Sequence, residues 1–160
     1  MADQNQWMYA KEVCKTLCEM LDARGWQYKK DEDSLFIECS AQGEDLPIAV
    51  RMEVDAERML VILFSELPFD VPEDKRVEMS LAISAINYTL VDGSFDYNFL
   101  NGNLLFRLTS SFRESMIADT ALEYMLYVSC NTVEAYNDKL FMLCKGMMSW
   151  EDITKAANES

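Results

Sequence analysis

The order in which apolar periodicities follow one another constrains the fold of this chain more than any other feature. From residue 5 to residue 23, apolar side chains recur every three or four positions, which predicts an amphipathic helix that ends at Gly25. Four short extended segments follow, at residues 26–30, 34–40, 46–54 and 58–65. The last of these is apolar at consecutive positions, so we expect it at the centre of a sheet and covered on both faces.

The second half of the chain also passes from helical periodicity to strand alternation and back. Apolar residues from about residue 72 to residue 90 form two stripes, which predicts a second helix that meets two surfaces. Alternating strands at about 95–99 and 104–108 flank a turn at Asn101 and Gly102. A long helix is expected at about 116–145, and a short terminal helix at about 149–157.

This grouping of strands between helices defines a fold class. Because strands and helices do not alternate one for one, we expect an α+β fold in the order α-ββββ-α-ββ-α, with a mainly antiparallel sheet packed with helices. The length is that of one domain, and no repeat or low-complexity segment interrupts it. Residues 1–160 are therefore expected to form a single domain.

The charge balance limits the partners and the chemistry. The chain has 28 acidic and 14 basic residues and no histidine, for a net charge of −14. Nucleic acids and anionic membrane surfaces are bound through Lys and Arg, so neither is expected as a partner. The absence of histidine excludes catalytic triads and histidine general bases. The acidic clusters lie in polar turns and not in apolar pockets, so we expect no enzymatic activity.

The chain has five cysteines, and most of them lie within apolar patterns: Cys14, Cys18, Cys39, Cys130 and Cys144. The polar N-terminus has no features of a secretory leader, and no apolar run approaches the ~20 residues that cross a bilayer. We therefore expect a cytoplasmic protein with free core thiols and no disulfides. Cys14 and Cys18 lie one helical turn apart, but structural zinc needs four ligands, so no metal or cofactor is expected.

A family resemblance is carried by the segment around the second hairpin. Asn87 is followed by Asp92-Gly93-Ser94-Phe95-Asp96-Tyr97, and then by Asn101-Gly102-Asn103-Leu104-Leu105-Phe106-Arg107. This order resembles the YbjN-like bacterial family, whose members are described as sensory transduction regulators. The resemblance implies a fold similar to that of type III secretion chaperones, which are small, acidic and commonly dimeric. It implies no catalytic residues.

These features together indicate a function in binding. The first interpretation is a non-enzymatic protein-binding module, a regulatory adaptor or chaperone-like homodimer whose partner is an unidentified protein or peptide segment. The alternative is a small-molecule sensor, or a histidine-free enzyme, with a pocket between the first helix and the sheet.

Two sets of residues are candidates for contacts with partners. The first extended segment is expected at or near a sheet edge, where Trp26 and Tyr28 present their rings on one face to an incoming strand. The alternative interpretation is that both rings pack on the first helix as core residues. Met79, Ile83 and Ile86 form one stripe of the second helix and are predicted near a twofold dimer contact.

Overall fold

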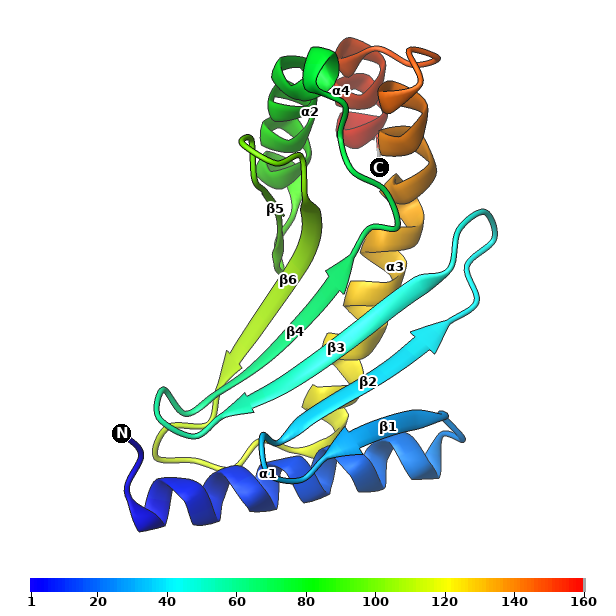
Figure 1. Cartoon of the computed structure of the whole chain (residues 1–160). Helices are drawn as coiled ribbons and strands as arrows, with labels where there is room; N and C mark the ends of the chain where they lie inside the picture. Colours follow the sequence, from blue (N-terminus) through cyan, green and yellow to red (C-terminus); the bar gives the residue numbers. More distant parts are fainter. Residues whose placement is uncertain (160) are drawn as a thin grey trace.

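The computed structural model describes residues 1–159 and has an α+β fold built on one six-stranded sheet (Figure 1). Its helices are α1 (Gln4–Ala23), α2 (Arg76–Thr89), α3 (Asp119–Cys144) and α4 (Trp150–Glu159), with a short 3₁₀ turn, η1 (Glu73–Lys75), before α2. Its strands are β1 (Tyr28–Asp31), β2 (Phe36–Ala41), β3 (Ile48–Asp55), β4 (Leu60–Glu66), β5 (Ser94–Tyr97) and β6 (Leu104–Ser111). The predicted order α-ββββ-α-ββ-α is confirmed.

The strands lie in the order β1-β2-β3-β4-β6-β5, and every neighbouring pair is antiparallel. Because side chains alternate along a strand, one row of each strand faces the helices and the other row faces away. In β3 the helix-facing row is Ile48, Val50, Met52 and Val54, and all four are buried. Figure 1 shows α3 running behind the sheet and α1 crossing below it. These two helices close the main core on one face.

Within residues 1–159 no helix lies on the other face of the sheet, which corrects the expectation that β4 is covered by helices on both faces. Its position in the middle of the sheet is as predicted, between β3 and β6. Leu60, Ile62 and Phe64 point to the open face; Leu60 and Phe64 are half-buried, and Ile62 is 7 % exposed. Long side chains from neighbouring strands shield this face in part; the Arg51 guanidinium lies 5.2 Å from the centre of the Phe36 ring. Shielding by such side chains explains why apolar residues are tolerated there without a covering helix.

At the far end of the molecule α2 packs against α4 (Figure 1). The start of α4 is capped by Ser149, whose hydroxyl accepts the N–H of Asp152 at 3.2 Å, while an Asp152 carboxylate oxygen accepts the Ser149 N–H at 3.2 Å. This reciprocal pair satisfies backbone donors that a helix start leaves free. Ile153 is fully buried and Ala157 is 4 % exposed, so α4 adds to the core beside α2.

Candidate protein-binding surface

The sheet has two edge strands, β5 and β1, and only the outer edge of β5 is contacted by a helix side chain. The edge of β5 is occupied by α2 through the side chain of Asn87. The Asn87 amide donates to the Phe95 carbonyl at 2.9 Å and accepts the Phe95 N–H at 2.8 Å. A side-chain amide with this geometry replaces a neighbouring strand, because it satisfies one backbone donor and one acceptor of the edge. Phe95 is therefore unavailable for pairing with another chain.

The edge of β1 has no neighbouring strand among residues 1–159, and β1 lies at the margin of the sheet as predicted. Three of its four residues are exposed. Its one partner is β2, with Tyr28 opposite Cys39. An unpaired strand edge exposes a row of N–H and C=O groups that can pair with an extended segment of another protein.

Trp26 and Tyr28 lie at the start of this edge, and both rings are half-buried against the core. The chain turns directly from α1 into this segment, where the Trp26 N–H donates to the Leu21 carbonyl at 3.0 Å. Burial raises the pKa of the Tyr28 phenol, and the carboxylate of Asp22 raises it further. Tyr28 therefore stays neutral across the physiological range. Each ring contacts the core on one side and keeps part of its surface accessible.

Trp26 also lines a hollow of about 220 Å³ between the end of α1 and the first half of α3. The hollow is mainly apolar, with Met20, Ala41, Leu126 and Cys130 among its walls. Arg24 and Glu123 close one side, where the Arg24 Nε donates to a Glu123 carboxylate oxygen at 2.7 Å. This hydrogen bond raises the pKa of Arg24 and lowers the pKa of Glu123. An apolar hollow beside an open strand edge can receive a side chain of a paired segment.

Two of the three basic side chains near this edge, Arg24 and Lys30, pair with acidic residues, and the third, Lys29, is exposed. Arg24 pairs with Glu123, and the Lys30 ammonium lies 3.3 Å from a carboxylate oxygen of Glu32. Such pairs reduce the local positive potential that phosphate groups need.

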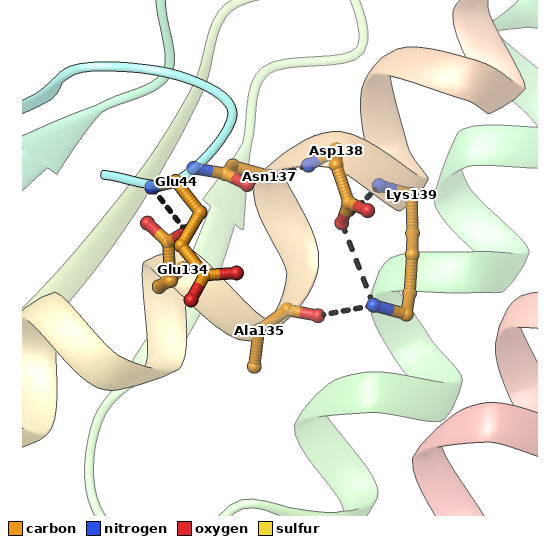
Figure 2. Close-up of polar contacts among 6 residues, drawn as sticks. All are labelled: Glu44, Glu134, Ala135, Asn137, Asp138 and Lys139. Atoms are coloured by element: carbon orange, nitrogen blue, oxygen red, sulfur yellow. Dashed lines mark hydrogen bonds and ion pairs between the residues drawn. The ribbon is translucent and has the colours of Figure 1, made fainter.

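A second polar cluster lies where the loop between β2 and β3 contacts α3 (Figure 2). A Glu134 carboxylate oxygen accepts the Glu44 N–H at 2.8 Å. Gly43 is required beside it, because a Cβ at that position would lie 2.1 Å from the Leu46 carbonyl oxygen. Figure 2 also shows Asp138 accepting from Lys139, at 3.4 Å from its ammonium. These carboxylates hold the loop backbone and a lysine in place.

The side chains predicted at a dimer contact lie inside the monomer. Met79 and Ile86 are fully buried and Ile83 is 6 % exposed, because α4 and the sheet cover this side of α2. The opposite stripe of α2 is the exposed one. Val77 is 63 % exposed and Tyr88 is 90 % exposed, with Leu81 between them. We call Val77, Leu81 and Tyr88 the free stripe of α2.

The described residues also bear on metal sites, disulfides and membrane-spanning helices. No group of three or more metal-binding side chains comes together within residues 1–159. In that part of the chain the five cysteines are all free, with Cys14 and Cys18 buried on α1. None of the helices so described is long and apolar enough to cross a bilayer. Trp7, Phe36 and Met52 do not together fill a pocket between α1 and the sheet, because Trp7 is 40 % exposed and Phe36 and Met52 belong to opposite faces of the sheet.

The antiparallel sheet with α1 and α3 on one face and α2 on its β5 edge is an α+β fold similar to that of type III secretion chaperones. Three solved structures show this likeness. A chain from the "ExsC-ExsE Complex" has a TM-score of 0.58 at 17% identity over 81% of this chain and 93% of its own length. One from the "HopA1-SchA Chaperone-Effector Complex" has a TM-score of 0.54 at 13% identity over 86% of this chain and 99% of its own. YbjN from E. coli has a TM-score of 0.57 at 12% identity over 84% and 93%.

The family follows from the sequence itself. The family model described as "YbjN: Putative bacterial sensory transduction regulator" matches residues 14–142, which is most of the chain. This chain therefore belongs to the YbjN family. No curated protein sequence matches it.

Proposed function

We propose that this protein is a non-enzymatic module of the bacterial cytoplasm that binds an extended segment of another protein along the edge of β1. The observation that carries the proposal is the difference between the two sheet edges. Asn87 occupies the edge of β5, whereas β1 presents an unpaired edge next to an apolar hollow. Backbone pairing would supply affinity, and the hollow lined by Trp26 would select a side chain.

The likeness to solved structures supports a protein as the ligand. Two of the similar structures are complexes by their titles, one of ExsC with ExsE and one of a chaperone with its effector. The net charge of −14 favours a partner segment that is basic, because opposite charge accelerates the encounter and suppresses acidic competitors. An adaptor or chaperone-like role follows if the partner is held in an extended form.

A photo-crosslinking experiment tests this proposal. A photoreactive phenylalanine analogue is placed at Gln27, which is exposed beside β1, or at Asn98, which is exposed at the end of β5. We expect the Gln27 position to crosslink one protein in source cells and mass spectrometry to map the contact to a single short segment of it. The Asn98 position controls for collisions at a sheet edge. Equal crosslinking from both positions, or from Asn98 alone, would show that β1 is not the binding edge.

Trp26→Ala separates a binding role of the ring from a structural one. Because the ring is half-buried, we expect the variant to lose clearly less than the ~3–5 kcal/mol typical of a fully buried aromatic residue. Binding of the crosslinked partner is expected to fall by at least tenfold, as for an anchor residue worth about 2 kcal/mol. A denaturant melt measures the first quantity and titration with the partner segment measures the second. Loss of stability at the full core value would contradict the anchor role.

A further inference from the structure

A second hollow lies at the other end of α1, away from the edge of β1. Its volume is about 440 Å³, within the range of roughly 300–1,000 Å³ that small-molecule sites occupy. It lies between the first turns of α1, the turn that joins β3 to β4, and the segment after β6. The lining residues are Asp3, Asn5, Gln6, Tyr9, Met59, Phe112, Glu114, Ser115 and Met116. Segments far apart in the sequence thus build one concave surface.

The walls of this hollow are apolar and polarisable. Phe112 is fully buried and forms the floor, and Met59 is half-buried beside it. Tyr9 is 43 % exposed and Met116 is 51 % exposed, so an aromatic ring and a thioether are available to a ligand. Methionine and aromatic surfaces adapt to varied apolar shapes, which suits recognition of a small organic body.

Both charged side chains that line the hollow are acidic. Asp3 and Glu114 contribute carboxylates, and no lysine or arginine lines it. Neither of the two acids takes part in an ion pair among the described residues. One Asp3 oxygen accepts the Gln6 N–H at 2.8 Å, which fixes the carboxylate at the start of α1. The polar end of a ligand there would have to be cationic or neutral.

The backbone around the hollow is held in a defined shape. The Met59 carbonyl accepts the Phe112 N–H at 3.0 Å, so the two sides of the floor are joined. Met59 and Glu114 both have φ of 56°, and within residues 1–159 only Leu35 is another non-glycine residue with positive φ. Side chains resist this left-handed conformation, and residues held in it cluster at ligand sites. Two of the three such positions therefore line one hollow.

We propose that this hollow binds a small organic cation with an apolar body, such as an amine or quaternary ammonium compound that carries an aromatic group. The apolar body lies against Met59 and Met116, above the buried Phe112, while the cationic end lies between the rim carboxylates and near the Tyr9 ring. An aromatic face attracts a cation in addition to the carboxylates. The site lies about 20 Å from the end of α1 that precedes Trp26, since 14 helical residues follow Tyr9 up to Ala23 at ~1.5 Å each. It is therefore independent of the proposed protein-binding edge.

Amide chemical shifts recorded by NMR test the proposal on the whole chain. Benzyltrimethylammonium is the probe, and benzylsulfonate is the control with a similar body and the opposite charge. We expect saturable shifts with the cation, confined to amides near residues 3–9, 59 and 112–116, and none with the anion. Shifts scattered over the acidic surface, or equal effects of both compounds, would overturn the proposal.

Two variants and a matched control make the result specific. Glu114→Gln removes a rim charge and is expected to weaken binding about fivefold, the size of one solvent-exposed charge contact. Glu151→Gln removes the same charge from an exposed position on α4 and should leave binding unchanged. Met116→Ala shortens a wall at a residue 51 % exposed, so the fold should persist while binding weakens. Equal weakening by Glu114→Gln and Glu151→Gln would mean that only the net charge attracts the cation, and no change with Met116→Ala would exclude the hollow.

Discussion

At the scale of single residues, the segment that carries the family likeness consists of structural positions. Asn87 satisfies the backbone of Phe95 in both directions, and thereby joins α2 to β5. Gly93 has φ of 73°, and a Cβ there would lie 2.4 Å from the Phe106 ring. Phe106 in turn packs edge-on against Phe95, with ring centres 5.3 Å apart. The motif therefore specifies how the hairpin packs and contributes no chemistry.

Asn87→Asp should destabilise the protein by about 1–3 kcal/mol, because it keeps one hydrogen bond to Phe95 and replaces the other by two facing oxygens. Urea unfolding measures this difference. Asn131→Asp is the control, since Asn131 is exposed on α3 and the same change there should have little effect. An equally small effect at both positions would show that the Asn87 side chain does not hold β5.

The cysteines should react slowly in the folded protein. Burial raises the pKa of Cys14, Cys130 and Cys144 to about 11 each and that of Cys39 to about 12, so thiolate is scarce at pH 8. We expect iodoacetamide to modify these four at least tenfold more slowly in native protein than in urea, as mass spectrometry of peptides would show.

Chelators and mild reductants should leave the Tm unchanged. A fall of several degrees with chelator would reveal a metal site.

At the scale of elements, the packing of α2 depends on the last helix of the chain. The sequence shows two apolar stripes on α2, and the structure buries the one with Met79 and Ile86 beneath α4 and the sheet. Helix α4 is short, and its contacts in the described chain are with α2 and α3. Its stability must therefore come from packing and not from its own length.

Ile153→Ala should cost about 2–5 kcal/mol, because Ile153 is fully buried where α4 meets the core. The smaller change Ile153→Val is expected to cost about 0.5–1.5 kcal/mol, which gives a graded series. Glu151→Ala on the exposed side of the same helix is the control. Denaturant melts of the four proteins would measure the series. A loss below 1 kcal/mol for Ile153→Ala would mean that α4 is not docked on α2 in solution.

At the scale of the whole molecule, the free stripe of α2 favours the association of two chains, and the net charge opposes it. Val77, Leu81 and Tyr88 expose apolar area that a twofold contact would bury. Two chains of charge −14 repel each other, and salt screens that repulsion over about 10 Å at 0.1 M. We propose that the free stripe is the homodimer contact in place of the buried residues.

Sedimentation at tens of micromolar should therefore show a dimer whose association strengthens with added salt. Leu81→Asp introduces a charge into the contact and is expected to give a monomer. Tyr127→Asp makes a similar change at a residue 66 % exposed on α3 and should leave the dimer intact. A stable dimer should bury about 1,200 Å² or more in total. Monomers of the unmodified chain at every salt concentration would contradict the twofold contact.

The sequence alone determined the kinds of elements and their order. Alternation and helical periodicity are local properties, since they follow from the geometry of the strand and the helix. The predicted boundaries were close to the observed ones. The long helix, for example, was predicted at about 116–145 and lies at Asp119–Cys144. The edge position of β1 was also predicted, because it opens a run of strands joined by short turns.

The tertiary structure alone decided which surfaces are covered. Both stripes of α2 are apolar, so the positions of α4 and the sheet select the one that is buried. Likewise, β4 is apolar on both faces, but the helices that pack on the sheet cover only one of them. The hollow at the start of α1 combines residues 3–9 with residues 59 and 112–116, which no local pattern connects. Burial depends on contacts between segments distant in sequence, and periodicity describes a segment only by itself.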